Sequence, residues 1–228
     1  MRRGVFVTGT DTAVGKTLVS CALIHALKAS GTDVMPMKPV AAGASSVDGH
    51  GIHEDGAALM AAAGCPEWLR ADVVPVLLRE PLAPHIAARR EGRRIALAPI
   101  RDAYARLLGH GAFMVVEGVG GFKVPLDDDL DTVDLARALE LPVVLVVGMR
   151  LGCLNHALLT VSAIEAAGLK LAGWIANGID PKMAAVEENV AALEERIAAP
   201  LMGRLPFAES PDARELARHL DVRTLAVP

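Results

Sequence analysis

The stretch VFVTGTDTAVGKTLVS, residues 5–20, restricts the possible folds of this chain more than any other segment. A short apolar run leads into a glycine-containing loop, and GKT then opens a segment with helical character. A strand, a loop and a helix in this order direct backbone N–H groups toward one point, which favours a bound anion. Five residues separate Gly9 from Gly15, one more than in the usual phosphate loop. An ordinary glycine-rich turn is the alternative.

The residues after this loop fit phosphate chemistry. Lys16 supplies a cation that can reach the β- and γ-phosphates of a nucleotide, and Thr17 offers a hydroxyl to Mg²⁺. Gly15 is small enough to admit a phosphate against the backbone. The extra residue predicts a wider loop that directs Thr12 and its neighbours toward a second ligand.

Composition limits the class of protein. The chain has 228 residues, of which 52% are hydrophobic and 3% aromatic, and such a core suits helices packed on a parallel sheet. The net charge is −4 with no basic block, so nucleic acid is not an expected partner. No apolar run is long enough to predict a membrane span. Cys21, Cys65 and Cys153 are expected to be unpaired thiols in a reducing cytoplasm, rather than disulfides or metal ligands.

Short apolar runs bounded by Gly or Pro alternate with helical patterns along the whole chain. The predicted strands are Val5–Thr8, Val34–Val40, Phe113–Glu117, Val143–Val147, Leu171–Asn177 and Leu201–Leu205. The predicted helices are Lys16–Ser30, Asp55–Ala63, Ile100–Leu108, Thr132–Leu139, Leu154–Ala167, Lys182–Ala198 and Asp212–His219. This alternation predicts one doubly wound α/β domain over residues 1–228, with a mostly parallel central sheet flanked by helices. The polar stretch Gly43–Gly56 is expected to be a mobile loop beside the site.

Ligands of such folds lie beyond the carboxyl ends of the strands, and nearly every unusual residue of this sequence falls at such an end. Glu117 ends the apolar run FMVVE, and a buried carboxylate there needs a cation, which predicts Mg²⁺ opposite Thr17. A turn or capping glutamate is the alternative. Asp55 is either a second magnesium carboxylate or the N-cap of the helix that follows. His50, His53 and Asp55 also suggest a zinc cluster, but no fourth ligand has matching spacing.

Three further strand ends carry polar groups with two interpretations each. Lys38 ends VMPMK and is either a solvated lysine or a cation for substrate or phosphate. Asn177 ends GWIAN and is either a turn residue or a ligand of a base edge, because its amide can donate and accept together. After the strand in VVGMRLGCLNHALLT, residues 146–160, free N–H groups could bind a carboxylate, or Asn155 could cap the helix.

Taken together and in this order, seven stretches resemble the dethiobiotin synthetase family over nearly the full chain. They are VTGTDTAVGKT, KPVAAG, PLAPHIA, VVEGVGG, VVGMRLGCLNHALLT, GWIANG and MGRLPF. The family carries the longer GTDTxVGKT loop, so the resemblance accounts for the altered spacing. It implies a P-loop NTPase-like fold and a homodimer with substrate near the subunit interface.

The resemblance also implies the reaction. It is the penultimate step of biotin biosynthesis, an ATP- and Mg²⁺-dependent ring closure of 7,8-diaminononanoate with CO₂ to dethiobiotin. A carbamate and a carbamic-phosphoric mixed anhydride are the implied intermediates.

The resemblance implies a role for individual residues. Catalysis is implied for Lys16, Lys38 and Thr12, and magnesium binding for Thr17, Asp55 and Glu117. Nucleotide binding is implied for Ala13, Val14, Gly15, Lys16, Thr17, Leu18, Asp55, Glu117, Gly118, Val119, Gly120, Asn177, Gly178, Pro206, Phe207, Ala208 and Asp212. Substrate binding is implied for Thr12, Lys38, Ala42, Gly152, Cys153 and Asn155, the last three from across the dimer.

The chain departs from the family at three places. Ala13 stands where many members have Glu, and Ala42 stands where a hydroxyl residue that contacts substrate is common. The segment LPFAESPDAREL is one residue shorter than in some relatives, which puts the role of Asp212 in doubt. None of these departures removes a charge that the implied reaction needs.

Three other classes of protein are alternatives to this family. Partition-type switch ATPases share the fold, but their marker is a lysine five positions before the loop lysine, where this chain has Asp11. Related amide-forming ligases usually carry a glutaminase domain, for which this chain has no room. A regulatory module that had lost turnover would lack a magnesium carboxylate, whereas Asp55 and Glu117 are both present.

Overall fold

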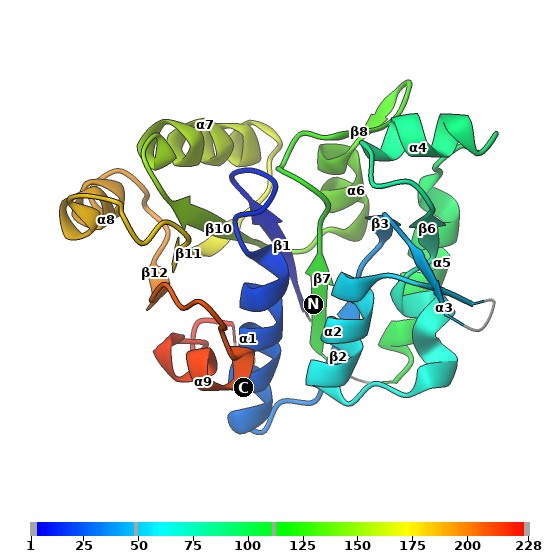
Figure 1. The fold of residues 1–228 in the computed structure, drawn as a ribbon, viewed down its shortest axis with the longest axis horizontal. Coiled ribbons are helices and arrows are strands. Elements are labelled where there is room, and N and C mark those ends of the chain that lie inside the picture. Colours follow the sequence, from blue (N-terminus) through cyan, green and yellow to red (C-terminus); the bar gives the residue numbers. More distant parts are fainter. Residues whose placement is uncertain (1–3, 48–49, 111–112, 226–228) are drawn as a thin grey trace.

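The computed structural model describes residues 4–47, 50–110 and 113–225. In these ranges six parallel strands form the central sheet in the order β12-β11-β10-β1-β7-β2 (Figure 1). Their bounds are β1 Gly4–Gly9, β2 Val34–Met37, β7 Phe113–Glu117, β10 Val143–Met149, β11 Leu171–Gly178 and β12 Leu201–Leu205. The predicted doubly wound α/β fold is confirmed.

Helices cover both faces of the sheet because its strands are apolar on both faces. In β1, Val5 and Val7 pack into one core cluster and Phe6 packs into another. The first cluster includes side chains of α1 (Lys16–Ala29), α2 (Glu54–Ala63) and α9 (Ala213–Leu216), and α2 and α9 both contact α1 (Figure 1). The opposite face is covered by α5 (Leu97–Leu108), α6 (Thr132–Leu139), α7 (Cys153–Ala166) and α8 (Val186–Glu194).

Smaller elements outside the central sheet complete the fold. Two short strands, β3 (Val40–Ala42) and β6 (Val76–Leu78), form a parallel pair. The antiparallel pairs are β4 (Ser45–Val47) with β5 (His50–Ile52) and β8 (Pro125–Asp127) with β9 (Leu130–Asp131). The short helices are η1 (Glu67–Leu69), α3 (Arg70–Val73), α4 (Pro84–Arg90) and η2 (Ala217–His219). No helix in the described ranges is long and apolar enough to cross a bilayer.

The predicted strand Val34–Val40 is wrong in its second half. The structure ends β2 at Met37, and Val40 begins β3, which pairs with β6 outside the central sheet. Between the two strands, the Lys38 N–H donates to the Val73 carbonyl at 2.7 Å, and Pro39 has no N–H for a ladder. The kink therefore turns the Lys38 side chain toward the carboxyl ends of the sheet.

Two other predictions of local structure are wrong in part. The stretch Gly43–Gly56, predicted as a loop, contains β4, β5 and the start of α2, while residues 48–49 lie outside the described ranges. The predicted helix Lys182–Ala198 is shorter in the structure. It begins at Val186 because Ala185 has a left-handed φ of 53°, and it ends at Glu194. The predictions Lys16–Ser30 and Thr132–Leu139 correspond to α1 and α6.

Candidate active site

The phosphate loop, residues 10–15, joins the end of β1 to the start of α1 at Lys16. Gly15 has a φ of 83°, a left-handed conformation that other residues rarely adopt. A Cβ atom at this position would lie 2.2 Å from Nδ2 of Asn177. Ala13 also has a positive φ, 58°, which is uncommon for a residue with a side chain and typical of functional loops. The loop conformation thus requires the glycine of the GKT motif.

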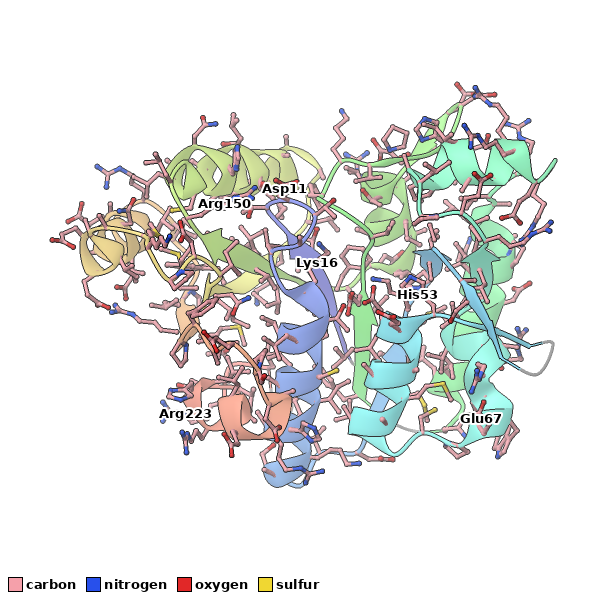
Figure 2. All side chains as sticks on the ribbon, in the orientation of Figure 1. Asp11, Lys16, His53, Glu67, Arg150 and Arg223 are labelled. Carbon is pink, nitrogen blue, oxygen red and sulfur yellow. The ribbon has the colours of Figure 1, made fainter. Side chains whose placement is uncertain are left out.

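Two side chains from neighbouring strands hold the phosphate loop. Asn177 lies inside β11, is buried, and donates from Nδ2 to the Val14 carbonyl at 2.8 Å, so its interpretation as a turn residue is wrong. Arg150, after β10, donates to Asp11 Oδ2 at 2.5 Å, and Figure 2 shows the two side chains together at the loop. The backbone N–H of Thr12, with Arg150, lowers the pKa of the Asp11 carboxyl.

A buried charge cluster lies beside the loop, formed by Lys38, Glu117, Asp55 and Thr17. The Lys38 Nζ lies 2.6 Å from Glu117 Oε1 and 2.8 Å from Asp55 Oδ2. Thr17 Oγ1 donates to Glu117 Oε1 at 2.9 Å. Lys38 is 3% exposed and Glu117 is fully buried, so Lys38 is no solvated lysine and Glu117 is no surface turn residue. Four elements, α1, α2, β7 and the β2–β3 connection, thus bring these groups together.

The cluster shifts the pKa values of its members. Burial works against the charged Lys38 ammonium, but Glu117 and Asp55 outweigh burial and raise the pKa of Lys38. Burial likewise opposes the charged Asp55 carboxylate, but Lys38 and the Thr17 hydroxyl outweigh it and lower the pKa of Asp55. Lys16, whose Nζ donates to the Asp11 carbonyl at 2.9 Å, behaves differently. Burial lowers the pKa of Lys16 to about 8, although the charge of Glu117 opposes the shift.

The oxygen atoms of this cluster fit a magnesium ion. Glu117 Oε2 is buried and has no hydrogen-bond partner among the described residues, which is uncommon for a carboxylate oxygen. Asp55 and Thr17 add a second carboxylate and a hydroxyl, which are hard oxygen ligands of the kind Mg²⁺ prefers. The described residues contain no group of three His, Cys, Asp or Glu side chains arranged for a metal ion, so they give no support to a zinc cluster. The side chain of His50 lies outside the described ranges.

The charge cluster lines a cavity of about 780 Å³ at the carboxyl ends of the strands. Of the predicted site residues, the cavity is lined by Thr12, Ala13, Gly15, Lys16, Thr17, Lys38, Ala42, Asp55, Glu117, Val119 and Gly120. Gly118 adjoins it, since its carbonyl accepts from Lys38 Nζ at 3.2 Å. Leu18, in α1, instead packs against a core cluster.

The predicted adenine-binding segments lie on the other side of the phosphate loop. There, Gly178 follows Asn177, and a Cβ on Gly178 would meet the backbone N of Phe207 at 2.7 Å, so β11 lies against the segment Pro206–Ala208. Asp212 caps α9, accepting from the backbone N–H groups of Arg214 and Glu215. None of these residues lines the cavity.

The start of α7 does not line the cavity either. Gly152 is the N-cap of α7, so the interpretation of Asn155 as that cap is wrong. Cys153 is buried, whereas Asn155 is exposed to solvent. The neighbouring Leu151 is 96% exposed.

Three features of the site are not predicted from the sequence: the cap formed by His53, the segment 81–84 in the cavity lining, and Arg150 at the phosphate loop. His53, not Asp55, is the N-cap of α2, so the interpretation of Asp55 as a cap is wrong. His53 lines the cavity, as does the segment 81–84, and Arg150 holds the phosphate loop. The sequence HED before a helical pattern was a signal for His53, but histidine is not a usual cap. No sequence signal links Arg150 to Asp11, which lies 139 residues away.

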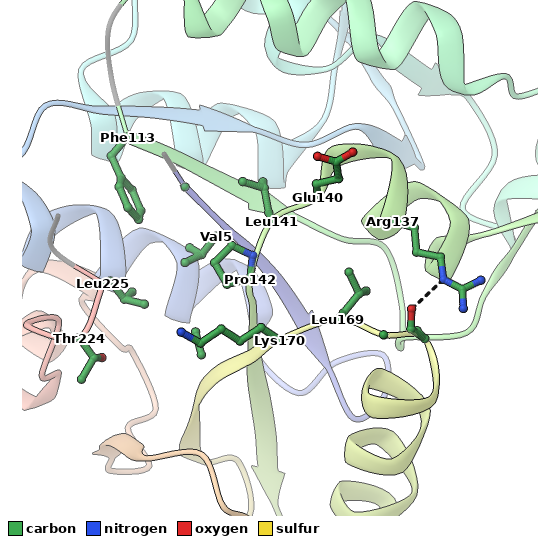
Figure 3. A pocket seen from close by; sticks show the side chains of 14 residues that line it. Val5, Phe113, Arg137, Glu140, Leu141, Pro142, Leu169, Lys170, Thr224 and Leu225 are labelled. Atoms are coloured by element: carbon green, nitrogen blue, oxygen red, sulfur yellow. Dashed lines mark hydrogen bonds between the residues drawn. The ribbon is translucent and has the colours of Figure 1, made fainter. Parts of the chain in front are cut away.

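A separate cavity of about 760 Å³ lies at the opposite, amino-terminal end of the sheet (Figure 3). Its lining includes Val5 and Phe113 at the starts of β1 and β7, Leu169 just before β11, and the charged residues Arg137 and Lys170. The Arg137 Nε donates to the Ala167 carbonyl at 2.9 Å. This cavity contains none of the predicted site residues.

Comparison with known proteins shows the family. A family model described as an AAA domain matches residues 3–214. The ATP-dependent dethiobiotin synthetase BioD of Aromatoleum aromaticum is 53% identical over 218 residues, covering 96% of this chain and 96% of that protein. The protein of the same name from Nitrosospira multiformis is 52% identical over 227 residues, covering 100% and 98%.

Solved structures with the same fold are more distant in sequence. A ParA family ATPase from Chlorobium tepidum has a TM-score of 0.55 and 16% identity, covering 99% of this chain and 93% of that one. The septum site-determining protein MinD from Pyrococcus horikoshii, complexed with Mg-ADP, has a TM-score of 0.54 and 18% identity, covering 98% and 89%. At this identity the likeness concerns the fold alone. The full-length identity above 50% therefore decides between the classes that share this fold, and the chain belongs to the dethiobiotin synthetase family.

Proposed function

We propose that this chain catalyses the ATP- and Mg²⁺-dependent ring closure of 7,8-diaminononanoate with CO₂, giving dethiobiotin, ADP and phosphate. The relatives named for ATP-dependent dethiobiotin synthesis supply the reaction class, a ligase of biotin biosynthesis. The observation that carries the proposal is the single cavity that joins the phosphate loop, two buried lysines and two carboxylates.

The reaction proceeds in three steps that balance. One amine of the substrate attacks CO₂, a C–N bond forms, and loss of a proton leaves a carbamate. A carbamate oxygen attacks the γ-phosphorus of ATP, the bond to ADP breaks, and a carbamic-phosphoric anhydride results. The second amine attacks the carbamate carbon, phosphate leaves with the bridging oxygen, and the ureido ring closes with loss of a proton.

Two lysines offset the repulsion between the carbamate and the triphosphate, both of which are anionic. Lys16 lies at the end of the phosphate loop, where it serves the β- and γ-phosphates. Lys38 enters the same cavity from the β2–β3 connection, with Thr12 and Ala42 also lining the walls, so it serves the carbamate. A fixed positive charge aimed at the transferring group is worth about 10²–10³ in rate. Positioning supplies much of the rest, because phosphoryl transfer needs little covalent chemistry from the protein.

The same cavity provides the magnesium ligands. Thr17, Asp55 and Glu117 would hold Mg²⁺, which when bound neutralises charge on the phosphate oxygens. The proposal assigns the remaining nucleotide contacts to the segments around the phosphate loop. Asn177, Gly178 and residues 206–208 serve the adenine, with Asp212 toward the ribose.

The proposal includes a homodimer in the cytoplasm. Leu151 and Leu159, at the start and on the surface of α7, are 96% and 62% exposed, as expected for residues that a second subunit covers. A partner at this face would bring Gly152, Cys153 and Asn155 toward the carboxylate of the substrate in the neighbouring site. The three cysteines are free thiols, which fits a reducing compartment.

The test is ADP release by the purified protein with ATP, Mg²⁺ and bicarbonate, measured with and without 7,8-diaminononanoate. We expect release that depends on the diamine and equals dethiobiotin mole for mole. Lys16→Ala should abolish both products. Lys170→Ala, at the opposite end of the sheet, is the matched control and should retain them. Equal ADP release with and without the diamine would contradict the proposal and favour a switch ATPase.

A further inference from the structure

His53 occupies an unusual position at the start of α2. Its backbone carbonyl accepts the first helical hydrogen bond, from the Ala57 N–H at 3.0 Å, and its Nδ1 accepts from the Asp55 N–H at 3.2 Å. Ser, Thr, Asp and Asn are the usual caps, because a short oxygen-bearing side chain satisfies such an N–H group. Histidine therefore calls for a reason other than capping alone.

The far side of the imidazole ring supplies that reason. His53 Nε2 lies 3.0 Å from the carbonyl oxygen of Ala42, the last residue of β3. A backbone N–H can only donate, so Nδ1 carries no proton, and Nε2–H then donates to Ala42. The ring thus bridges the end of β3 to the first turn of α2. A serine or aspartate cap is too short to make both bonds.

Ala42 and Asp55, the two residues that the bridge joins, both line the cavity, and the His53 side chain is only 14% exposed. Asp55 directs its Oδ2 to the Lys38 ammonium at 2.8 Å, and its side chain is 31% exposed, so packing alone does not fix it. The chain between residues 42 and 53 contains the paired strands β4 and β5, and the bridge joins the two residues that flank this segment. Figure 2 shows His53 at the start of α2, on the opposite side of the site from the phosphate loop.

We propose that His53 is a positioning residue. Its two hydrogen bonds fix the direction of the Asp55 carboxylate toward the metal position and hold Ala42 in place at the cavity wall. This inference rests on the proposed role of Asp55 as a magnesium ligand. Side chains that orient metal ligands typically change metal affinity by about 10–100-fold when removed. The effect falls on the metal and not on the nucleotide, because the bridge makes no contact with the phosphate loop.

Three variants separate the two bonds of the bridge. His53→Asn retains an acceptor near the position of Nδ1 and loses the donor to Ala42. His53→Gln retains a donor near the position of Nε2 and loses the cap. His53→Ala loses both. Asp131→Ala is the matched control, since Asp131 caps α6 with a capping box and does not line the cavity.

The measurement is Mn²⁺ binding in the presence of ADP, followed by the electron paramagnetic resonance signal of free Mn²⁺. We expect His53→Asn and His53→Gln each to weaken Mn²⁺ binding about threefold to tenfold, and His53→Ala at least tenfold. Affinity for ADP without metal should stay within about twofold of wild type. Asp131→Ala should lower the unfolding temperature without changing Mn²⁺ binding.

Three results overturn the inference, and Asp55→Asn distinguishes the first two. If Asp55→Asn loses Mn²⁺ while all three His53 variants bind it like wild type, the positioning role is wrong and the metal role stands. If Asp55→Asn binds Mn²⁺ like wild type, the proposed metal role fails and the positioning role fails with it. Weakening in Asp131→Ala equal to that in His53→Ala would also overturn the inference, since general destabilisation would then explain both.

Discussion

At the scale of single residues, the site depends on the charges around Lys38. Its ammonium lies between Glu117 and Asp55, and Glu117 is fully buried, so each charge is tolerated only because the others are present. The same lysine faces the cavity where the proposed carbamate forms. Replacing it should therefore affect stability as well as activity.

Replacing Lys38 by methionine keeps most of its volume and removes its charge. Breaking a buried ion pair typically costs about 3–5 kcal/mol, and we expect a loss near the lower limit because Asp55 remains partly solvated. The double variant Lys38→Met/Glu117→Gln removes the orphaned charge and should regain much of that stability. Urea unfolding of both variants measures the two free energies of unfolding. If Lys38→Met alone were as stable as wild type, the ion-pair account would be contradicted. Neither variant should close the ring.

Lys16 gives the site a pH dependence. Because burial lowers the pKa of Lys16 to about 8, the lysine loses its charge as pH rises above 8, whereas the raised pKa of Lys38 keeps that lysine charged. If only the charged form binds triphosphate, ATP affinity should fall by about tenfold per pH unit above that value. Calorimetric titration of ATP at pH values from about 7 to about 9.5, a range that brackets the pKa of Lys16, would show this fall. A flat profile for wild type would argue against the role of Lys16, and Lys16→Arg, which stays charged, should give a flat one.

At the scale of elements, the phosphate loop is held from two sides by bonds of unequal strength. Asn177 bonds the Val14 carbonyl inside the protein, whereas the Asp11 and Arg150 side chains are 46% and 39% exposed. A buried acceptor left without its donor costs about 1–3 kcal/mol, but an exposed ion pair contributes about 0–1 kcal/mol after solvent screening. The buried bond of Asn177 should therefore contribute more than the Asp11–Arg150 ion pair to holding the phosphate loop in its conformation.

Asn177→Ala and Arg150→Ala compare the two supports directly. We expect Asn177→Ala to lower stability by about 1–3 kcal/mol and ATP affinity about tenfold, since the loop loses its buried anchor. Arg150→Ala should change stability by less than about 1 kcal/mol. Urea unfolding and calorimetric ATP titration measure both, and the reverse order would contradict the ranking by burial.

Local sequence pattern predicts the strands, the phosphate loop and the carboxyl-end residues well, because each rests on periodicity or on one short motif. It fails at the β2–β3 kink, where Val34–Val40 reads as one apolar strand, but Lys38 bonds Val73 and Pro39 breaks the ladder. Sequence also leaves Asp55 open between cap and ligand. The cap interpretation fails because His53 is itself the N-cap of α2, and the further bond of His53 to the Ala42 carbonyl has no local pattern.

At the scale of the whole molecule, the sheet order gathers distant segments at one edge. The Val14–Asn177 bond joins residues 163 apart, and the Thr17–Glu117 bond joins residues 100 apart. The site therefore exists only in the completed fold. The thiols test whether the fold is complete, because Cys21 is buried on the core-facing side of α1 while Cys65 is partly exposed.

Thiol labelling should follow global unfolding at Cys21. Burial, with the charges of Glu117 and Asp55, raises the pKa of Cys21 to about 12, so roughly one molecule in 10⁴ carries the reactive thiolate at about pH 8. We expect native protein to react first at Cys65, and at Cys21 only in denaturant. Peptide mass mapping after timed alkylation would identify the site, and rapid labelling of Cys21 in native protein would contradict a closed core.

The most direct test of the central claim follows the oxygen atoms of CO₂. Starting from ¹⁸O-labelled bicarbonate, with the reaction quenched before exchange with water, mass spectrometry would measure the label in phosphate and in dethiobiotin. If a carbamate oxygen attacks the γ-phosphate in the cavity of Lys16 and Lys38, each turnover places one labelled oxygen in phosphate and one in the ureido carbonyl. Labelled dethiobiotin with unlabelled phosphate would contradict the mixed anhydride, and no labelled dethiobiotin would contradict the ring closure itself.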